Sequence, residues 1–378
     1  MFKRVFIINL ILVCFLQLSF NVTASDVEIV CTAKNYAVLE ADTKTLLMSS
    51  ACREKKSISH LTKLMTILLC AQSIENKTLS VQDIVVVTPT ANSMQGTQIW
   101  LEIGERITVE ELLYAVTVGN ANDAAVALAE KVGKTHEGFI EMMNLKAYEL
   151  GMYDTVFVDA GGTSDENVST AYDIGLLCCE LVKYDFLKQY FTTWMINVRS
   201  AKTELVNSNR LVRSYNGITG LKACFSEKSG HCITISSKRG DMYLIGVFFD
   251  CADNDTKFSD AKTVLDKCFS QFTVYVPEIS EYLSEVLIKG GTNAKVKVHL
   301  TKPLKAIVLK SEVKNIQTTC QRKDTIQAAF AANTQIGTID LLLNGETIAH
   351  SDIITAQGCK KKDVLFSLKK LLCRLLIY

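Results

Sequence analysis

The pattern of apolar positions predicts a helix from His60 to about Ser73. Apolar side chains recur there with the i, i+3, i+4, i+7, i+8 spacing of one buried helix face; they are Leu61, Leu64, Met65, Leu68 and Leu69. Serine is a preferred residue at helix N-termini, so we expect Ser57 or Ser59 to cap this helix. Residues near 60 therefore lie at the start of a largely buried helix.

Two more helices are predicted on either side of a short polar break. The runs Val109 to Val118 and Asp123 to Val132 both show helical spacing of apolar residues. Between them stands Gly119-Asn120-Ala121-Asn122, a composition typical of a tight turn. Such a turn exposes its polar side chains.

Strand patterns come before and after these helices. Residues Tyr36 to Met48 predict a hairpin around an Ala-Asp-Thr-Lys turn. The runs His231 to Ser237 and Met242 to Phe249 predict a second hairpin, joined by residues 238–241. Residues 25–272 are therefore expected to form one mixed α/β (α+β) domain.

After about Phe272 the pattern changes to short strands without a long helix. Ala294 to Leu300 and Ile336 to Leu343 are the clearest of them, and Asn344-Gly345 is a strong hairpin turn signal. We expect a small all-β domain over residues 273–358.

Both ends of the chain carry apolar segments of another kind. Lys3 and Arg4 precede an apolar run from Val5 to Leu16, and small residues follow, so residues 1–24 are predicted to be a secretory signal peptide. A membrane-spanning helix is the alternative, but the run is short for a bilayer. The mature chain is expected to begin near Ser25, outside the cytoplasm.

The tail, residues 359–378, is predicted to be an amphipathic helix that lies on an anionic membrane surface. Its leucines fall on one helical face, with Lys370 and Arg374 opposite and the basic run 360–362 beside it. The alternative is an ordinary helix packed on the β domain.

Composition adds bounds to this picture. A chain of 378 residues favours two domains, and a net charge of +1 gives no global attraction to nucleic acid. Of the 13 cysteines, Cys14 leaves with the signal, and the others show no CxxC motif or disulfide framework. We expect small buried side chains rather than disulfides, and Cys178 and Cys179 are adjacent, so they cannot bridge without strain.

Three separated segments carry the candidate chemistry. They are Ser57-Ile58-Ser59-His60-Leu61-Thr62-Lys63, Asn120-Ala121-Asn122-Asp123, and Gly220-Leu221-Lys222-Ala223-Cys224-Phe225. In order and spacing they resemble the SxxK, SxN and KTG motifs of the serine D-alanyl-D-alanine carboxypeptidases, the low-molecular-mass penicillin-binding proteins. The resemblance extends over most of the mature chain, and it implies a β-lactamase/transpeptidase-like first domain without a cofactor.

The motifs are altered at their reactive positions. His60 stands at the nucleophilic serine, Asn120 at the second-motif serine, and Ala223 and Cys224 at the threonine and glycine of the third. The retained motif residues are Lys63 at the general-base position, Asn122 and Lys222. Since a serine hydroxyl forms the acyl-enzyme in this family, the resemblance implies a peptidoglycan-associated protein that binds stem peptides but is catalytically impaired.

The resemblance assigns further roles around the cleft. The backbone N–H groups of His60 and Phe225 stand where the family stabilises the oxyanion. Lys257 stands where the family often has an arginine that meets the substrate carboxylate, although a solvated surface lysine is the alternative.

Other reactive residues leave alternatives open. An active serine peptidase could use Ser59, which precedes Lys63 by four residues, or His60 could act as base or nucleophile. Cys224 is expected to be an inert thiol at the strand edge. We expect no metal site, because His231 and Cys232 point to opposite strand faces. A structural or partner-binding protein with a vestigial cleft is a third possibility, and the sequence leaves the oligomeric state open.

Overall fold

The computed structural model of the protein describes residues 31–364. The predicted signal peptide and residues 365–378 of the predicted tail helix lie outside the described residues. Cys359 and Lys361 are not helical but form β-bridges with Phe330 and Gly291, so a helix beginning at residue 359 is wrong for these positions. Between residues 31 and 364, no helix is both long enough and apolar enough to cross a bilayer.

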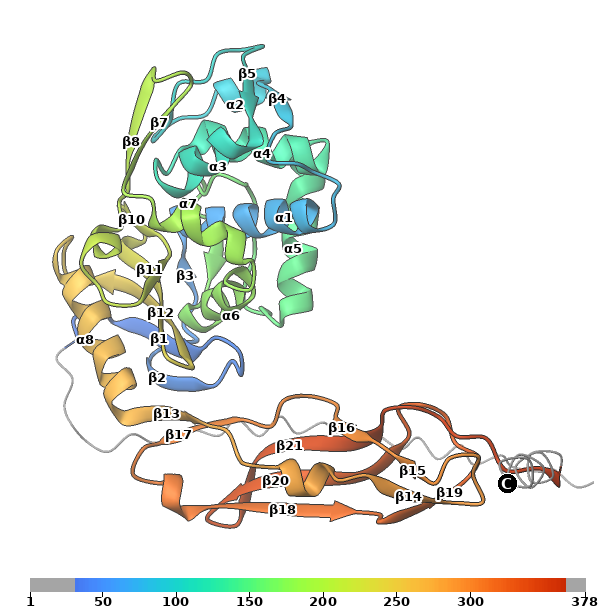
Figure 1. Ribbon diagram of the computed structural model, residues 1–378. Helices are drawn as coiled ribbons and strands as arrows, with labels where there is room; N and C mark the ends of the chain where they lie inside the picture. Colours follow the sequence, from blue (N-terminus) through green and yellow to red (C-terminus); the bar gives the residue numbers. More distant parts are fainter. Residues whose placement is uncertain (1–30, 365–378) are drawn as a thin grey trace, which may run out of the picture.

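A central antiparallel sheet forms the middle of the first domain (Figure 1). Its strand order is β10-β11-β12-β1-β2, and β9 also pairs with β11. The bounds are β1 Asn35–Glu40, β2 Leu46–Ser50, β9 Ile218–Gly220, β10 Ala223–Ser226, β11 Gly230–Arg239 and β12 Met242–Cys251. Both predicted hairpins are present, β1–β2 and β11–β12, and β10 lies at the sheet edge.

Helices cover both faces of this sheet (Figure 1). One face packs on a large core with α1 Lys63–Glu75, α3 Val109–Thr117, α4 Asn122–Gly133, α5 His136–Leu150 and α6 Ala171–Leu181. The other face packs on α8 Thr256–Gln271. The three helices predicted from apolar spacing are therefore present as α1, α3 and α4.

The predicted cap of the first helix is wrong. A 3-10 turn, η1 Ser59–Thr62, precedes α1, and neither segment has a side-chain cap. The Ser57 hydroxyl is buried without a partner, and Ser59 has a φ of 43°, outside the usual extended N-cap geometry. The chain enters the helix through a backbone turn rather than through a serine cap.

Short elements complete the first domain. They are β3 Lys56–Ser57, β4 Ile84–Val86, α2 Pro89–Asn92, β5 Arg106–Thr108, β6 Val168–Ser169, η2 Asp185–Leu187, α7 Lys188–Thr192, β7 Met195–Val198, β8 Thr203–Val206 and η3 Arg210–Arg213. The pairs β3–β6, β4–β5 and β7–β8 are small two-stranded sheets.

The chain leaves α8 into an all-β region, as the strand pattern predicts (Figure 1). Its elements are β13 Phe272–Tyr275, η4 Ser280–Leu283, β14 Val286–Lys289, β15 Lys295–Val296, β16 Val298–Leu300, β17 Ala306–Leu309, η5 Val313–Asn315, β18 Ile316–Arg322, β19 Thr325–Gln327, β20 Gln335–Leu343 and β21 Glu346–Thr355. Asn344 and Gly345 have φ values of 52° and 87°, as a type I′ hairpin turn requires. The region has its own apolar core.

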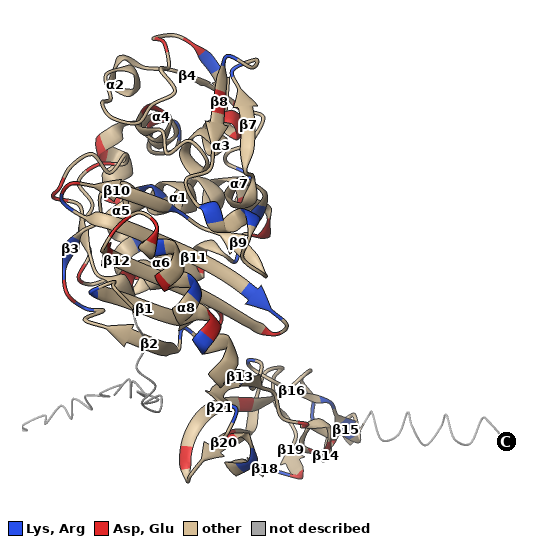
Figure 2. Ribbon diagram, turned by 90° about the vertical axis from the view of Figure 1, so that its left-hand side faces the viewer, with Lys and Arg blue, Asp and Glu red and all other residues tan. Residues whose placement is uncertain are grey.

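Charged residues of both signs are dispersed over both regions (Figure 2). This distribution agrees with the near-neutral net charge, so any charge that recognises a ligand must be local.

Candidate active site

The structure brings the three motif segments together between the helices and the sheet edge. Lys63 begins α1, Asn122 begins α4 after the α3–α4 turn, and Lys222 immediately precedes β10. These three side chains are at most 1% exposed. Tight packing around this centre follows from the buried start of α1 and from the close approach of η1 to β10.

The Lys63 amine is the hub of the site. Its Nζ lies 2.7 Å from Asn122 Oδ1 and 2.5 Å from the Gly161 carbonyl oxygen, and both accept hydrogen bonds. It also lies 3.0 Å from His60 Nδ1. Burial, followed by the charge of Lys222, holds the pKa of Lys63 well below its ordinary value. The amine that would serve a serine hydroxyl therefore contacts an imidazole instead.

His60 is a neutral residue at physiological pH. Burial lowers its pKa to about 3, and the positive charges of Lys63 and Lys222 act in the same direction. An uncharged imidazole held beside a buried amine is a hydrogen-bonding partner that does not form the ester of an acyl-serine.

Acid should therefore destabilise the protein through His60. The unfolded chain binds a proton at His60 near pH 6.5, whereas the folded chain does so only near pH 3, so stability is lost as pH falls across that window. His60→Asn lacks this titrating group. We therefore expect its free energy of unfolding to depend less steeply on pH in this window, by the equivalent of up to about one bound proton. Urea unfolding at several pH values measures this slope. Parallel curves for the two proteins would contradict the neutral assignment.

Asn120 lies in the α3–α4 turn and contacts strand β10. It has a φ of 61°, which asparagine tolerates better than most residues, and its Nδ2 lies 3.4 Å from the Ala223 carbonyl oxygen. Its amide thus reaches across to β10. The Asn122 amide donates to the Gln95 carbonyl at 2.6 Å, which fixes its Oδ1 toward Lys63.

Lys222 is held at the end of α3. Its Nζ donates to the Val116 carbonyl oxygen at 2.6 Å, and burial lowers its pKa to about 7. Helix C-terminal carbonyls are natural partners for a cation. This lysine therefore supplies positive charge to the site while its amine stays anchored on α3.

Strand β10 presents its residues to different surroundings. Ala223 is fully buried in the core on the α8 side, and Cys224 packs in the core on the opposite face. Phe225 is 52% exposed, and its ring lies 4.5 Å from that of His231. The Ser208 hydroxyl donates to the Ala223 carbonyl at 2.8 Å. Of these three β10 residues, only Phe225 is exposed.

Lys257 is not the solvated surface lysine of the alternative interpretation. It is 3% exposed, and its Nζ lies 3.3 Å from the Cys224 carbonyl oxygen. Burial lowers its pKa. It is therefore a third buried lysine beside the same strand, brought there by α8.

Ser59 is buried, but Lys63 does not contact it. The hydrogen-bonding partners of the Lys63 amine are His60, Asn122 and Gly161, each described above. With a φ of 43°, Ser59 is outside the α-helix, so the helical step of about 100° per residue does not describe its orientation.

One part of the site was not predicted, the loop 159–164. Asp159 accepts hydrogen bonds from the backbone of Gly162, Thr163 and Ser164, and this places the Gly161 carbonyl on Lys63. The adjacent glycines Gly161 and Gly162 were the available signal, because such a pair often marks a close backbone approach.

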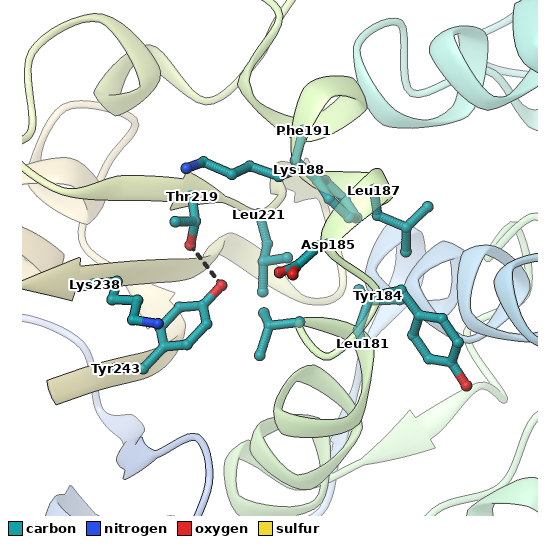
Figure 3. A pocket seen from close by; sticks show the side chains of 11 residues that line it. Leu181, Tyr184, Asp185, Leu187, Lys188, Phe191, Thr219, Leu221, Lys238 and Tyr243 are labelled. Atoms are coloured by element: carbon teal, nitrogen blue, oxygen red, sulfur yellow. Dashed lines mark hydrogen bonds between the residues drawn. The ribbon is translucent and has the colours of Figure 1, made fainter. Parts of the chain in front are cut away.

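A separate pocket lies elsewhere, beside β9 (Figure 3). It has a cavity volume of about 170 Å³, and the Thr219 hydroxyl lies 2.9 Å from that of Tyr243 within its wall. It shares no residue with the lysine cluster. Between residues 31 and 364, no group of three histidine, cysteine or acidic side chains could hold a metal ion.

Comparison with protein families gives two matches. Residues 21–253 match the family described as D-alanyl-D-alanine carboxypeptidase. Residues 269–361 match the penicillin-binding protein 5 C-terminal domain.

Individual relatives agree with these matches. D-alanyl-D-alanine carboxypeptidase DacF of Bacillus subtilis is 31% identical over 91% of this chain and 90% of its own length. DacC of Escherichia coli, another carboxypeptidase, is 25% identical over 87% of this chain and 84% of its own. The crystal structure of penicillin binding protein 5 from Haemophilus influenzae has a TM-score of 0.78 at 20% identity, covering 90% of this chain and 100% of that one. This solved structure shows the same fold, an α/β domain followed by an all-β domain.

Proposed function

The chain belongs to the D-alanyl-D-alanine carboxypeptidase family, and from that premise we propose that it binds wall peptides ending in D-alanyl-D-alanine without forming an acyl-enzyme. The observation that carries the proposal is the 3.0 Å contact between Lys63 Nζ and His60 Nδ1. In the intact motif that amine would take a proton from a serine hydroxyl.

The chemical step lacks its nucleophile. Loss of the nucleophile in a serine peptidase costs on the order of a millionfold in rate, while the oxyanion hole and binding leave roughly a thousandfold over water. His60 is neutral and engaged with Lys63, and the positions of two further reactive hydroxyls hold Asn120 and Ala223. We infer that substrate turnover is negligible.

The binding part of the machinery supports the proposal. The edge strand β10 offers backbone groups to an extended peptide, and the exposed ring of Phe225 lies at its end. Lys63, Lys222 and Lys257 lie beside this strand, and burial lowers the pKa of each, so a bound anion would favour their protonated, positively charged forms. A peptide carboxylate is the ligand group that such an arrangement favours, and its binding would offset the cost of burying the lysines.

Titration calorimetry with a synthetic peptide ending in D-alanyl-D-alanine tests this function. We expect saturable heat, and we expect Lys257→Ala to weaken binding about five- to tenfold, because about 1 kcal/mol is typical for loss of a partly desolvated charge contact. Lys262→Ala is the matched control, since Lys262 is exposed on the same helix and should bind like the native protein.

Two results would oppose the proposal. Absence of heat at millimolar peptide would favour a structural or partner-binding protein with a vestigial cleft. Equal affinity for a peptide ending in L-alanyl-L-alanine would remove the link to the wall peptide.

We further propose that the protein is exported and held at the outer face of the cytoplasmic membrane. The sequence of residues 1–24 supports export, and the amphipathic pattern of residues 359–378 supports attachment to an anionic surface. Removing residues 365–378, which keeps the β-bridges of Cys359 and Lys361, should move the protein from the membrane pellet to the soluble fraction after cell breakage. A truncated protein that still pellets would rule out this anchor.

A further inference from the structure

Two cysteines face each other across the edge of the central sheet. Cys224 of β10 and Cys232 of β11 are directly paired in the antiparallel register, on strands that lie side by side in Figure 1. Directly opposed residues in such a ladder have Cα atoms about 4.5–5.5 Å apart, within the range that a disulfide spans. Both are free thiols, and they are 4% and 1% exposed.

The surroundings divide the two thiols into different roles. The pKa of Cys224 is lowered, first by its interaction with the Cys232 side chain and then by the charges of Lys257, Lys222 and Lys63, while burial acts in the opposite direction. The pKa of Cys232 is raised by the same interaction and by burial. The Cys232 thiol donates to the Ser229 carbonyl oxygen at 3.2 Å. Cys224 is thus the thiol that reacts as a thiolate, and Cys232 is placed to resolve a mixed disulfide.

Other buried thiols of the first domain lack this arrangement. Burial alone raises the pKa of Cys70 to about 12, and burial also raises that of Cys268. Neither has a lysine among the groups that shift its pKa. The combination of a facing partner and three nearby lysines therefore distinguishes Cys224.

We propose that Cys224 and Cys232 form a dithiol–disulfide couple that is oxidised by external disulfides of the form R–S–S–R. The Cys224 thiolate attacks one external sulfur, the R–S–S–R bond breaks, and one R–S⁻ leaves. Cys232 then loses its proton and attacks Cys224, which releases the second R–S⁻. The two cysteines are oxidised by two electrons and one external disulfide is reduced. The proton of Cys232 goes to one leaving thiolate, and the other leaving thiolate takes from solvent the proton that Cys224 released when it ionised.

The couple changes the charge beside β10. When Cys224 loses its proton in the reduced state, its negative charge offsets positive charge on the nearby lysines, whereas a disulfide is neutral. Oxidation should therefore favour binding of a peptide carboxylate at this strand, a consequence that rests on the proposed function. The disulfide itself does not depend on that function, so the two can fail separately.

Peptide mapping tests the couple on the full chain. The protein is reduced, freed of reductant, exposed to oxidised glutathione, blocked with N-ethylmaleimide and digested with trypsin without reduction. Cleavage after Lys222, Lys228 and Lys238 separates peptide 223–228 from peptide 229–238. We expect these two peptides to appear joined and two hydrogens lighter than their sum, and dithiothreitol to separate them. Failure to join, or joining of either peptide to Cys251 instead, would overturn the proposal.

Single substitutions test the assigned order of attack. Cys232→Ser should leave a stable glutathione adduct on Cys224, because no resolving thiol remains. Cys224→Ser should prevent any adduct on Cys232, and an adduct there would contradict the assignment. Cys268→Ser is the matched control, because Cys268 is buried on α8 and should leave the joined peptides unchanged.

Discussion

The variant with His60→Ser, Asn120→Ser, Ala223→Thr and Cys224→Gly is expected to form a covalent adduct with fluorescent penicillin. The reason is that Lys63, Asn122 and Lys222 already occupy their family positions, and the oxyanion amides belong to the backbone. Restoring the hydroxyl nucleophile should raise the labelling rate by on the order of a thousandfold or more. A fluorescent band after gel electrophoresis measures it.

The matched control retains the histidine. The triple variant Asn120→Ser, Ala223→Thr and Cys224→Gly differs from the full set only at residue 60, and it should remain unlabelled. If the fourfold variant has the same unfolding temperature as the native protein yet takes no label, the scaffold is not preorganised for acylation, and our account of the site is wrong.

Gly162→Ala is expected to cause the largest loss of stability among single substitutions near the site. An alanine Cβ there would lie 2.1 Å from the Ser59 carbonyl oxygen, so η1 and the loop 159–164 could not both keep their positions. We expect a loss of several kcal/mol in the free energy of unfolding, from backbone overlap added to the cost of a positive φ. Urea unfolding measures it.

Gly104→Ala separates these two contributions. Gly104 has a φ of 79°, close to the 69° of Gly162, but a Cβ at residue 104 meets no atom within 4 Å. This control should lose only about 1 kcal/mol, the usual cost of a side chain at positive φ. Equal losses for the two variants would show that the contact between Gly162 and η1 is unimportant.

Helix and strand positions in the first domain could be predicted because their apolar spacing agrees with their burial. The runs that became α1, α3 and α4 each pack an apolar face on the same core. The 3-10 turn at Ser59 could not be predicted from this spacing, because it depends on the close packing of η1 against Gly162.

The sequence motifs indicate which residues belong to the candidate site, but they do not indicate which of these residues are buried or how their pKa values are shifted. Motif spacing picked out Lys63, Asn122 and Lys222, and in the structure all three lie at the ends of elements, with Lys63 Nζ 2.7 Å from Asn122 Oδ1. Burial of Lys257 and the lowered pKa of Cys224 arise from contacts between β10 and α8, far apart in sequence. Neither follows from local pattern, and the expectation of an inert Cys224 thiol stays a prediction that the proposed disulfide couple would contradict.

The ends of the chain remain predictions. The signal peptide and residues 365–378 of the tail fall outside residues 31–364, and their assignment depends on the sequence pattern.

The most direct test of the central claim is the intact mass of the native protein after incubation with excess benzylpenicillin. Because His60 occupies the serine position and Ser59 does not contact Lys63, we predict an unchanged mass. A gain of one penicillin, lost on Ser59→Ala, would show a working serine nucleophile and contradict the proposal that this site binds without acylation.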